Sequence, residues 1–133
     1  MTRTALVTGG TRGIGAAIAR ALADNDHQVI VTYQGNDDAA AAFTRETGIP
    51  ARKWDVTDFE ACQAEVSAIE EEFGGIDVLV NNAGITRDGM LHKMGIDDWD
   101  AVIQTNLTSV FSMTRAVING MRDRGFGRII QIS

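Results

Sequence analysis

Short, mostly apolar runs alternate with amphipathic stretches along the whole chain. The strand-like runs fall at residues 4–8, 27–32, 50–54, 76–80 and 128–132. The first run is continuous rather than alternating, as expected of a strand that is buried on both faces of a parallel sheet. Short buried runs separated by helical segments are typical of βαβ units. The pattern therefore predicts five parallel strands with helices between them.

The first two segments between these runs have helical features. Ile14, Ile18 and Leu22 are spaced four residues apart and predict one apolar helix face after the first strand. Asp37 and Asp38 stand at the start of an alanine-rich stretch, where a side-chain oxygen stabilises a helix N-terminus. We expect these two acids to cap the second helix.

Two further helices are predicted after the third strand. Asp58 is expected to cap the third, and Gly74 to end it. A longer helix is predicted from about Asp97 to Arg124, with one apolar side. That side is expected to carry Trp99, Val102, Ile103, Val110, Phe111, Val117, Ile118 and Met121.

Five strands joined by right-handed crossovers predict an α/β fold, a Rossmann-type doubly wound parallel sheet with strand order 3-2-1-4-5. In such a sheet a ligand binds outside the carboxyl ends of the strands, where the winding reverses between strands 1 and 4. Three polar loops are predicted to meet there, at residues 8–15, 55–56 and 81–84.

Composition and charge narrow the classes of function. The net charge is −6, from 18 acidic and 12 basic residues, which argues against a nucleic-acid or anionic membrane partner. The single cysteine, Cys62, cannot form an internal disulfide and fits a reducing compartment. No apolar window of about 18 residues and no signal peptide is found. We therefore expect a cytoplasmic protein.

The loop at residues 8–15 joins a buried strand to an amphipathic helix and is rich in glycine. Gly9 is expected to take the positive φ of a tight turn. Gly13 lacks a Cβ and leaves room for a diphosphate at the helix N-terminus, where unpaired N–H groups and the helix dipole favour an anion. Gly15 is expected to let the helix pack closely on the sheet. A glycine cluster alone is also consistent with a plain strand-to-helix turn. The prediction of a ligand site therefore depends largely on the other two loops, at residues 55–56 and 81–84.

The segment Thr8-Gly-x-x-x-Gly-x-Gly15 closely resembles the cofactor motif of the short-chain dehydrogenase/reductase family. Asn-Asn-Ala-Gly at residues 81–84 is similar to the second signature of that family. Asp55 and Val56 match the residues that contact the adenine in the family, and Asn106 matches the asparagine of its Asn-Ser-Tyr-Lys tetrad. These motifs occur in the family's order, and the resemblance covers the whole chain.

The resemblance implies an oxidoreductase in which residues 1–133 form an NAD(P)-binding Rossmann domain, incomplete and truncated after the fifth strand. Asn106 is the one catalytic residue that it predicts. His27 and His92 lack metal-ligand spacing, so we expect no metal site. The cofactor-binding residues implied are Gly9, Thr11, Arg12, Gly13, Ile14, Gly15, Asp55, Val56, Asn82, Ala83 and Gly84.

The cofactor is expected to be NADP(H) rather than NAD(H). An enzyme that uses NAD typically places a carboxylate at the end of the second strand, roughly 20 residues past the glycines, to bind the ribose 2′-hydroxyl. Residues 32–36 contain no acid there, whereas Arg12 can pair with a 2′-phosphate. Asp37 and Asp38 would oppose a phosphate only if they pointed inward.

Most of the catalytic groups that the resemblance calls for are missing from these residues. In the family a tyrosine donates the proton, a lysine four residues later lowers its pKa, and a serine orients the carbonyl. The only tyrosine here is Tyr33, with no lysine four residues on, and Ser133 aligns beside the expected serine. We expect no reductase activity from the 133 residues alone. A cofactor-binding fragment, part of a longer enzyme, and a structural protein without ligand stay open as alternatives.

Residues 82–88 and 98–107 look like the branch of the family that reduces 3-oxoacyl thioesters, with Arg87 and Asp88 near the substrate entrance or simply solvated. Residues 119–130 are more similar to the acetoacetyl-CoA reductases of polyhydroxybutyrate synthesis. The resemblance thus implies NADPH-dependent reduction of acetoacetyl-CoA to 3-hydroxybutyryl-CoA in the full-length parent. The alternative is a 3-oxoacyl-acyl-carrier-protein reductase of fatty-acid synthesis. It also implies a homo-oligomer, a tetramer in the parent, formed through the long helix.

Overall fold

The computed structural model describes residues 2–84 and 91–132. Arg87 and Asp88, which were expected near a substrate entrance, lie outside the described residues, as does Ser133. No helix in the described ranges combines the length and apolar character that crossing a bilayer requires.

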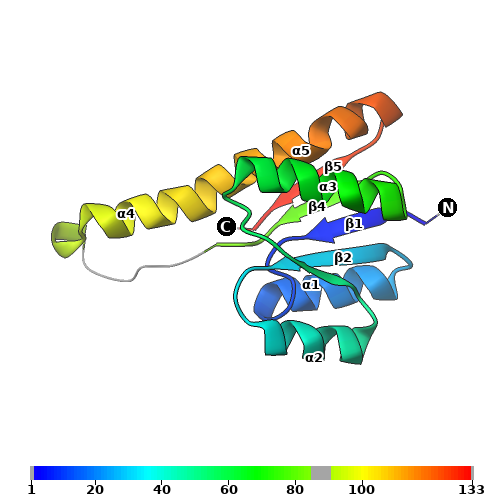
Figure 1. The fold of residues 1–133 in the computed structure, drawn as a ribbon, viewed down its shortest axis with the longest axis horizontal. Coiled ribbons are helices and arrows are strands. Elements are labelled where there is room, and N and C mark those ends of the chain that lie inside the picture. The colour runs from blue at the N-terminus through cyan, green and yellow to red at the C-terminus, as the bar shows by residue number, and fades with distance from the viewer. Residues whose placement is uncertain (1, 85–90, 133) are drawn as a thin grey trace.

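A parallel sheet of five strands forms the centre of the molecule (Figure 1). The strands run in the order β3-β2-β1-β4-β5, which confirms the predicted order. In the register of the sheet, Ala5 of β1 lies between Val29 of β2 and Val78 of β4. The strands are β1 (Thr4–Val7), β2 (Gln28–Tyr33), β3 (Ala51–Lys53), β4 (Val78–Asn81) and β5 (Arg128–Gln131).

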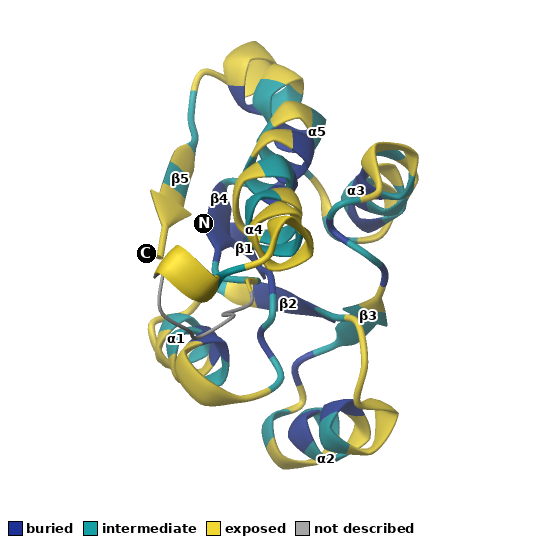
Figure 2. Cartoon of the chain, turned by 90° about the vertical axis from the view of Figure 1, so that its left-hand side faces the viewer, coloured by how far each residue is buried: buried dark blue, intermediate teal, exposed yellow. Residues whose placement is uncertain are grey.

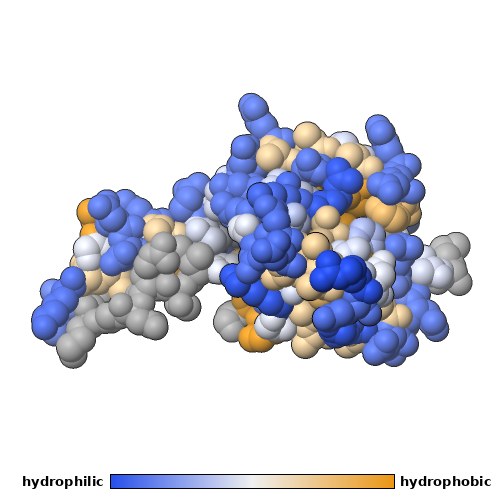
Figure 3. Space-filling view, turned by 60° about the horizontal axis from the view of Figure 1, so that its bottom comes forward, coloured by the Kyte–Doolittle hydropathy of each residue, from blue (hydrophilic) through white to orange (hydrophobic). Residues whose placement is uncertain are grey.

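Helices cover both faces of the sheet. α1 (Gly13–Asp24) and α2 (Asp37–Thr47) lie on one face, and α3 (Phe59–Phe73) and α5 (Ser109–Arg124) on the other (Figures 1 and 2). The surface over α1 and α2 is mainly hydrophilic (Figure 3). This arrangement buries the strands on both sides, as their continuous apolar runs require.

A polar side chain caps each of two helices at its N-terminus. Asp58 Oδ1 accepts a hydrogen bond from the backbone N–H of Ala61 at 3.0 Å, so the predicted cap of α3 is confirmed. The predicted cap of α2 is wrong. Asn36 is the cap, and its Oδ1 accepts from Ala39 N at 3.0 Å. Asp37 and Asp38 instead occupy the first turn, where their charge favours the helix dipole.

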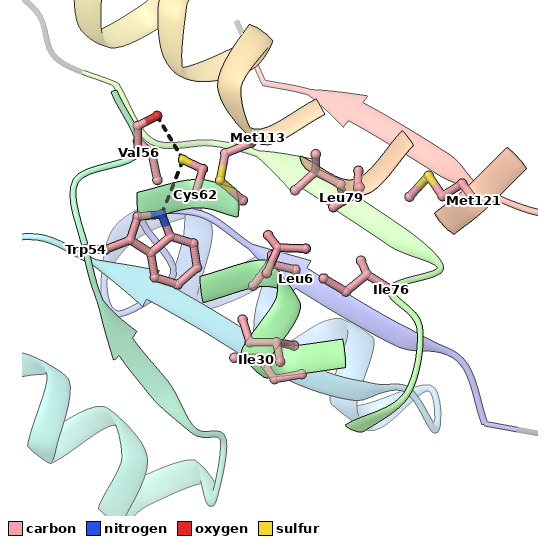
Figure 4. Close-up of a cluster of buried hydrophobic side chains, with 12 residues drawn as sticks. Leu6, Ile30, Trp54, Val56, Cys62, Ile76, Leu79, Met113 and Met121 are labelled. Carbon is pink, nitrogen blue, oxygen red and sulfur yellow. Dashed lines mark hydrogen bonds between the residues drawn. The ribbon is translucent and has the colours of Figure 1, made fainter. Parts of the chain in front are cut away.

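The two faces of the sheet have separate hydrophobic clusters. Leu6, Ile30 and Leu79 point toward α3 and α5 (Figure 4). Their strand neighbours, such as Val7 and Val31, point toward α1 and α2. Successive side chains in a strand face opposite sides, which produces this division. Each fully buried aliphatic side chain stabilises the fold by about 2 kcal/mol.

The apolar face predicted for α1 is only partly right. Ile18 and Leu22 pack against the cluster on that face of the sheet, but Ile14 is 64% exposed. Gly15 and Ala19 are the buried residues of this helix. Ile14 lies in the first turn of the helix, next to its uncapped N-terminus.

The long helix predicted from Asp97 to Arg124 is three consecutive segments. α4 (Ile96–Ile103) continues through a π-helical segment, η2 (Gln104–Thr108), into α5. A short 3-10 turn, η1 (Leu91–Lys93), precedes α4. In Figure 1 the α4 end projects away from the sheet, and in Figure 2 it is largely exposed.

The buried side of this rod agrees only in part with the predicted one, with Val117 and Met121 buried as predicted. In α5 the buried residues are Ser109, Ser112, Met113, Val117 and Met121. Trp99 and Phe111, which the periodicity placed on the apolar side, are 51% and 62% exposed. The sheet does not extend under α4, so hydrophobicity alone does not bury that part of the rod.

Candidate functional site

A pocket of about 330 Å³ opens at the carboxyl edge of the sheet, between the ends of β1, β2 and β4. The loops after these strands meet there, as the strand order predicts. Its lining consists of Gly9, Thr11, Arg12, Thr32, Tyr33, Gln34, Gly35, Asn36, Trp54, Val56, Asn82, Ala83, Gly84 and Thr105.

The turn after β1 is held very close to the loop after β4. Gly9 has a φ of +62°, as predicted for the tight turn. A Cβ on Gly15 would lie 2.1 Å from the carbonyl oxygen of Gly9 and 2.6 Å from Nδ2 of Asn82. Gly15 therefore makes a close approach, as predicted, but to the glycine turn and Asn82 rather than to the strands of the sheet.

Thr8 joins the two loops through its hydroxyl. Its Oγ1 accepts hydrogen bonds from the backbone N–H groups of Asn82, at 3.0 Å, and Ala83, at 2.9 Å. In return, Nδ2 of Asn82 donates to the carbonyl oxygen of Gly9 at 3.1 Å. These bonds fix the position of residues 82–84 relative to the glycine turn. Thr8 was not among the predicted site residues, although a buried hydroxyl at the end of a central strand was a usable signal.

The N-terminus of α1 is open toward this edge. Arg12 is the N-cap residue, yet no side chain caps the helix and its first turn contains no acid. Gly13 has a φ of +59°, and a Cβ there would meet no described atom within 4 Å. The first N–H groups of a helix have no partner within it, so these groups and the helix dipole make the edge attractive to an anion.

The end of β2 forms a neutral wall of the pocket. Gln34, Gly35 and Asn36, none of them charged, line it. Oγ1 of Thr32 also accepts from the N–H of Gly9 at 3.4 Å, which ties this wall to the glycine turn. In the sequence, the lack of acids at residues 32–36 only favoured NADP(H) over NAD(H), and these residues were not predicted to line the site.

Val56 lines the pocket and is buried, whereas Asp55 is not among the lining residues. Oδ1 of Asp55 accepts from the backbone N–H of Thr57 at 2.9 Å and from its hydroxyl at 2.6 Å. The carboxylate therefore shapes the turn that presents Val56. Whether Asp55 contacts a base stays a prediction.

The Cys62 thiol links Trp54 and Val56, two residues that line the pocket (Figure 4). Nε1 of Trp54 donates a hydrogen bond to Sγ of Cys62 at 3.4 Å. The Cys62 thiol in turn donates to the carbonyl oxygen of Val56, also at 3.4 Å. Burial raises the pKa of the Cys62 thiol, which keeps it protonated. Trp54 is thus a core residue that also lines the pocket.

Arg12 is the only charged residue among the described residues that line the pocket. Asp37 lies nearby, but its carboxylate accepts from the Tyr33 hydroxyl at 3.0 Å and pairs with Nζ of Lys53 at 3.2 Å. The hydrogen bond from Lys53, followed by that from Tyr33, lowers the pKa of Asp37. The same carboxylate raises the pKa of Tyr33.

Asn106 lies in the π-helical segment, next to the mouth of the pocket. A Cβ on Gly84 would approach its Oδ1 to 2.7 Å, and the neighbouring Thr105 lines the pocket. The hydroxyl of Ser109 donates to the carbonyl oxygen of Thr105. Because π turns reorient side chains within a helix and are frequent at functional sites, this segment accounts for the position of Asn106 beside the second loop.

The structure brings most of the predicted cofactor residues together. Those that line the pocket are Gly9, Thr11, Arg12, Val56, Asn82, Ala83 and Gly84. Gly13, Ile14 and Gly15 belong to the first turn of α1 rather than to the lining. Within residues 2–84 and 91–132, no three His, Cys, Asp or Glu side chains gather as they would around a metal ion.

The chain is similar to one family of known proteins. The family model described as short chain dehydrogenase matches residues 3–133. An acetoacetyl-CoA reductase of Paracoccus denitrificans and one of Shinella zoogloeoides are each 59% identical to the chain over 133 residues. A 3-oxoacyl-[acyl-carrier-protein] reductase of Vibrio harveyi is 44% identical over 132 residues. The matches cover 98–100% of this chain but only 54–55% of each relative, so the chain spans about half their length.

Proposed function

Because the chain belongs to the short-chain dehydrogenase family, we propose that its pocket binds the adenosine and diphosphate portion of NADP(H). One observation carries this proposal: the uncapped N-terminus of α1 and the single charge of Arg12 meet at a pocket whose other lining residues are neutral. A dinucleotide is an anion with apolar faces, and this combination suits it.

The described residues fit such a cofactor. The space that a Cβ on Gly13 would enter is open, which leaves a diphosphate free to approach the helix N-terminus. Val56 and Trp54 supply apolar surface on the wall away from α1, as an adenine ring requires. Thr8 holds the loop at residues 82–84 in place, where it forms the opposite wall.

Two features favour NADP(H) over NAD(H). Tyr33 and Gln34 stand at the end of β2, where an enzyme that uses NAD typically has an acid. Asp37 is paired with Lys53 and does not line the pocket, so no described carboxylate opposes a phosphate there. The Arg12 guanidinium can then form charge-assisted hydrogen bonds with the 2′-phosphate.

We further propose that the residues serve the reduction of a 3-oxoacyl thioester, with acetoacetyl-CoA as substrate and a role in polyhydroxybutyrate synthesis. When bound, the nicotinamide supplies the hydride. Asn106, beside Gly84, is proposed to hold a water molecule in the proton path. Tyr33 is not suited to donate the proton, because its hydroxyl is bonded to Asp37, which raises its pKa. The 133 residues alone are therefore proposed to bind cofactor without turnover of acetoacetyl-CoA.

The higher identity to relatives named acetoacetyl-CoA reductase, 59% against 44%, supports a coenzyme A thioester over an acyl-carrier-protein thioester. The two substrates differ in the carrier and not in the reacting carbonyl. Comparing kcat/KM for acetoacetyl-CoA and for acetoacetyl-acyl-carrier protein, on an active form of the protein, decides between them.

Calorimetric titration of the chain with NADP⁺ and NAD⁺ tests the cofactor proposal. We expect tighter binding of NADP⁺, and we expect Arg12→Ala to weaken it by about tenfold or more while changing NAD⁺ binding little, because a charge-assisted bond is lost. Arg20→Ala is the matched control, since Arg20 is an exposed arginine of the same helix that does not line the pocket.

Tighter binding of NAD⁺ that does not respond to Arg12→Ala would overturn the preference. A midpoint of thermal unfolding that stays the same at saturating NADP⁺ would favour a structural protein without ligand, because a ligand that binds only the folded state must stabilise it.

We also propose that the chain self-associates through the α4–η2–α5 rod. Ile96, Trp99, Leu107 and Phe111 are large apolar residues on this rod, and each is more than half exposed. Exposed apolar surface concentrated on one element is typical of a protein interface.

A further inference from the structure

Tyr33 separates the proposed cofactor pocket from a second hollow beside it. The residue lines both, and the second hollow lies between α2 and β3 with Asp37 and Arg45 on its wall. The Tyr33 hydroxyl donates to Oδ1 of Asp37 at 3.0 Å. The Asp37 carboxylate is thus one hydrogen bond away from a side chain that faces the pocket.

Lys53 of β3, the register partner of Tyr33 on the neighbouring strand, contacts the same carboxylate. Its Nζ lies 3.2 Å from Oδ1 and 3.3 Å from Oδ2 of Asp37. The two oxygens of Asp37 are therefore occupied by Tyr33 and Lys53 together. The lowered pKa of Asp37, caused first by Lys53, agrees with this geometry.

The direction of this carboxylate matters for a cofactor with a phosphate on its ribose. A carboxylate free to reach the pocket would accept hydrogen bonds from ribose hydroxyls and would repel a 2′-phosphate. We propose that Lys53 and Asp37 are specificity-determining residues: Lys53 holds Asp37 away from the pocket and balances its charge, so that the pocket accepts a 2′-phosphate. This inference rests on the proposed NADP(H) site.

The expected effect is moderate, because both side chains are at the surface, with 51% of Lys53 and 65% of Asp37 exposed. Asp37 nevertheless follows Asn36 in the chain and is bonded to Tyr33, and both of these residues line the pocket. Charges separated by less than the Debye length of about 8 Å at physiological salt still interact. An unbalanced carboxylate facing a phosphate of charge near −2 at that range weakens binding by about fivefold.

Three variants of the chain test the inference by calorimetry with NADP⁺ and NAD⁺. Lys53→Met is expected to weaken NADP⁺ binding about fivefold and to leave NAD⁺ binding unchanged or tighter, because the Asp37 carboxylate keeps its bond to Tyr33 but loses its balancing positive charge. Asp37→Asn is expected to retain NADP⁺ binding. The double variant Lys53→Met/Asp37→Asn is expected to restore the wild-type ratio of the two dissociation constants.

Arg20→Met is the matched control. It breaks another surface ion pair, between Arg20 and Glu46, with an N···O distance of 3.2 Å and exposures of 49% and 66%. Neither residue lines the pocket, so the ratio of the two dissociation constants should stay at the wild-type value.

Each contrary result has a distinct meaning. A double variant as weak for NADP⁺ as Lys53→Met alone overturns the inference, because Asp37 would then not mediate the effect. Parallel weakening of NADP⁺ and NAD⁺ by Lys53→Met also overturns it, since that indicates a general loss of positive charge. Failure of the wild-type chain to prefer NADP⁺ refutes the proposed cofactor instead, independently of any Lys53 variant.

Discussion

Gly15 determines how closely α1 approaches the glycine turn. Any larger residue would place a Cβ 2.1 Å from the carbonyl oxygen of Gly9, a contact with rigid backbone rather than with a flexible side chain. The helix would have to move outward. Such a shift would also displace Asn82, whose Nδ2 lies 2.6 Å from the same Cβ position.

Gly15→Ala is therefore expected to destabilise the fold by about 2–3 kcal/mol, as other overpacking substitutions do. Urea unfolding followed by circular dichroism measures this. Gly35→Ala is the control, because its Cβ would meet no described atom within 4 Å. Equal stability of the two variants would show that the loop adapts and that Gly15 is not required.

The residues with the clearest local physics were predicted correctly from the sequence. Gly9 has the expected positive φ, and Gly15 makes a close approach, although to the glycine turn and not to the sheet. The cap of α2 was misassigned because Asn36, Asp37 and Asp38 can all cap a helix. Only the backbone angles of Asn36, φ −90° and ψ 93°, decide among them. The wall at Gln34 and Gly35 was missed because neutral residues carry no chemical signal.

At the scale of elements, periodicity predicted where helices occur better than which side they bury. The rod of α4, η2 and α5 follows the predicted range closely. The buried side was right at Val117 and Met121 but wrong at Trp99, because α4 projects away from the sheet. It was also wrong at Phe111, which stacks on Phe59 of α3 and stays 62% exposed. The π turn around Asn106 adds a local change of phase that a constant period of 3.6 residues per turn does not include.

The stability that Cys62 of α3 contributes, where this helix meets the loop after β3, should decrease at alkaline pH. Burial raises the pKa of Cys62, so the folded chain keeps the thiol protonated above its ordinary value of 9.0, whereas the unfolded chain ionises there. The stabilisation from Cys62 is complete below that value and is lost as the pH rises toward the raised pKa of the folded state. The advantage of wild type over Cys62→Ala in unfolding free energy should therefore narrow between about pH 8 and about pH 10.

Chemical denaturation of both proteins across this range measures the difference, in which titrations common to both cancel. Val66→Ala, a truncation in the same buried cluster, provides a control whose deficit should not change with pH. A constant advantage of wild type over Cys62→Ala would mean that the thiol does not differ in ionisation between the two states.

For the whole molecule, the strand order was predictable because right-handed crossovers leave few arrangements of five parallel strands. What lies against the exposed rod was not predictable from physics, since an apolar helix face has the same pattern whether it packs on a sheet or on another subunit. The resemblance to the family supplied that expectation.

Light scattering coupled to size exclusion tests the proposed self-association. Wild type is expected to have at least twice the monomer mass of 14.3 kDa, and Leu107→Glu should shift it toward the monomer by placing a charge in the interface. Ile14→Glu provides the control, because Ile14 is 64% exposed, similar to Leu107 at 62%, but lies on α1. A monomeric wild type, or equal masses for all three proteins, would contradict the proposal.

The separation of the buried side chains into two clusters has a consequence for how this sequence can diverge. Leu6 contributes to one layer while its neighbours Ala5 and Val7 contribute to the other. Because the side chains of the two clusters pack on opposite faces of the sheet, a substitution in one cluster is coupled mainly to its contacts in that cluster. The side chains packed beneath α1 and α2 can therefore be substituted, in evolution or in design, while those beneath α3 and α5 stay unchanged.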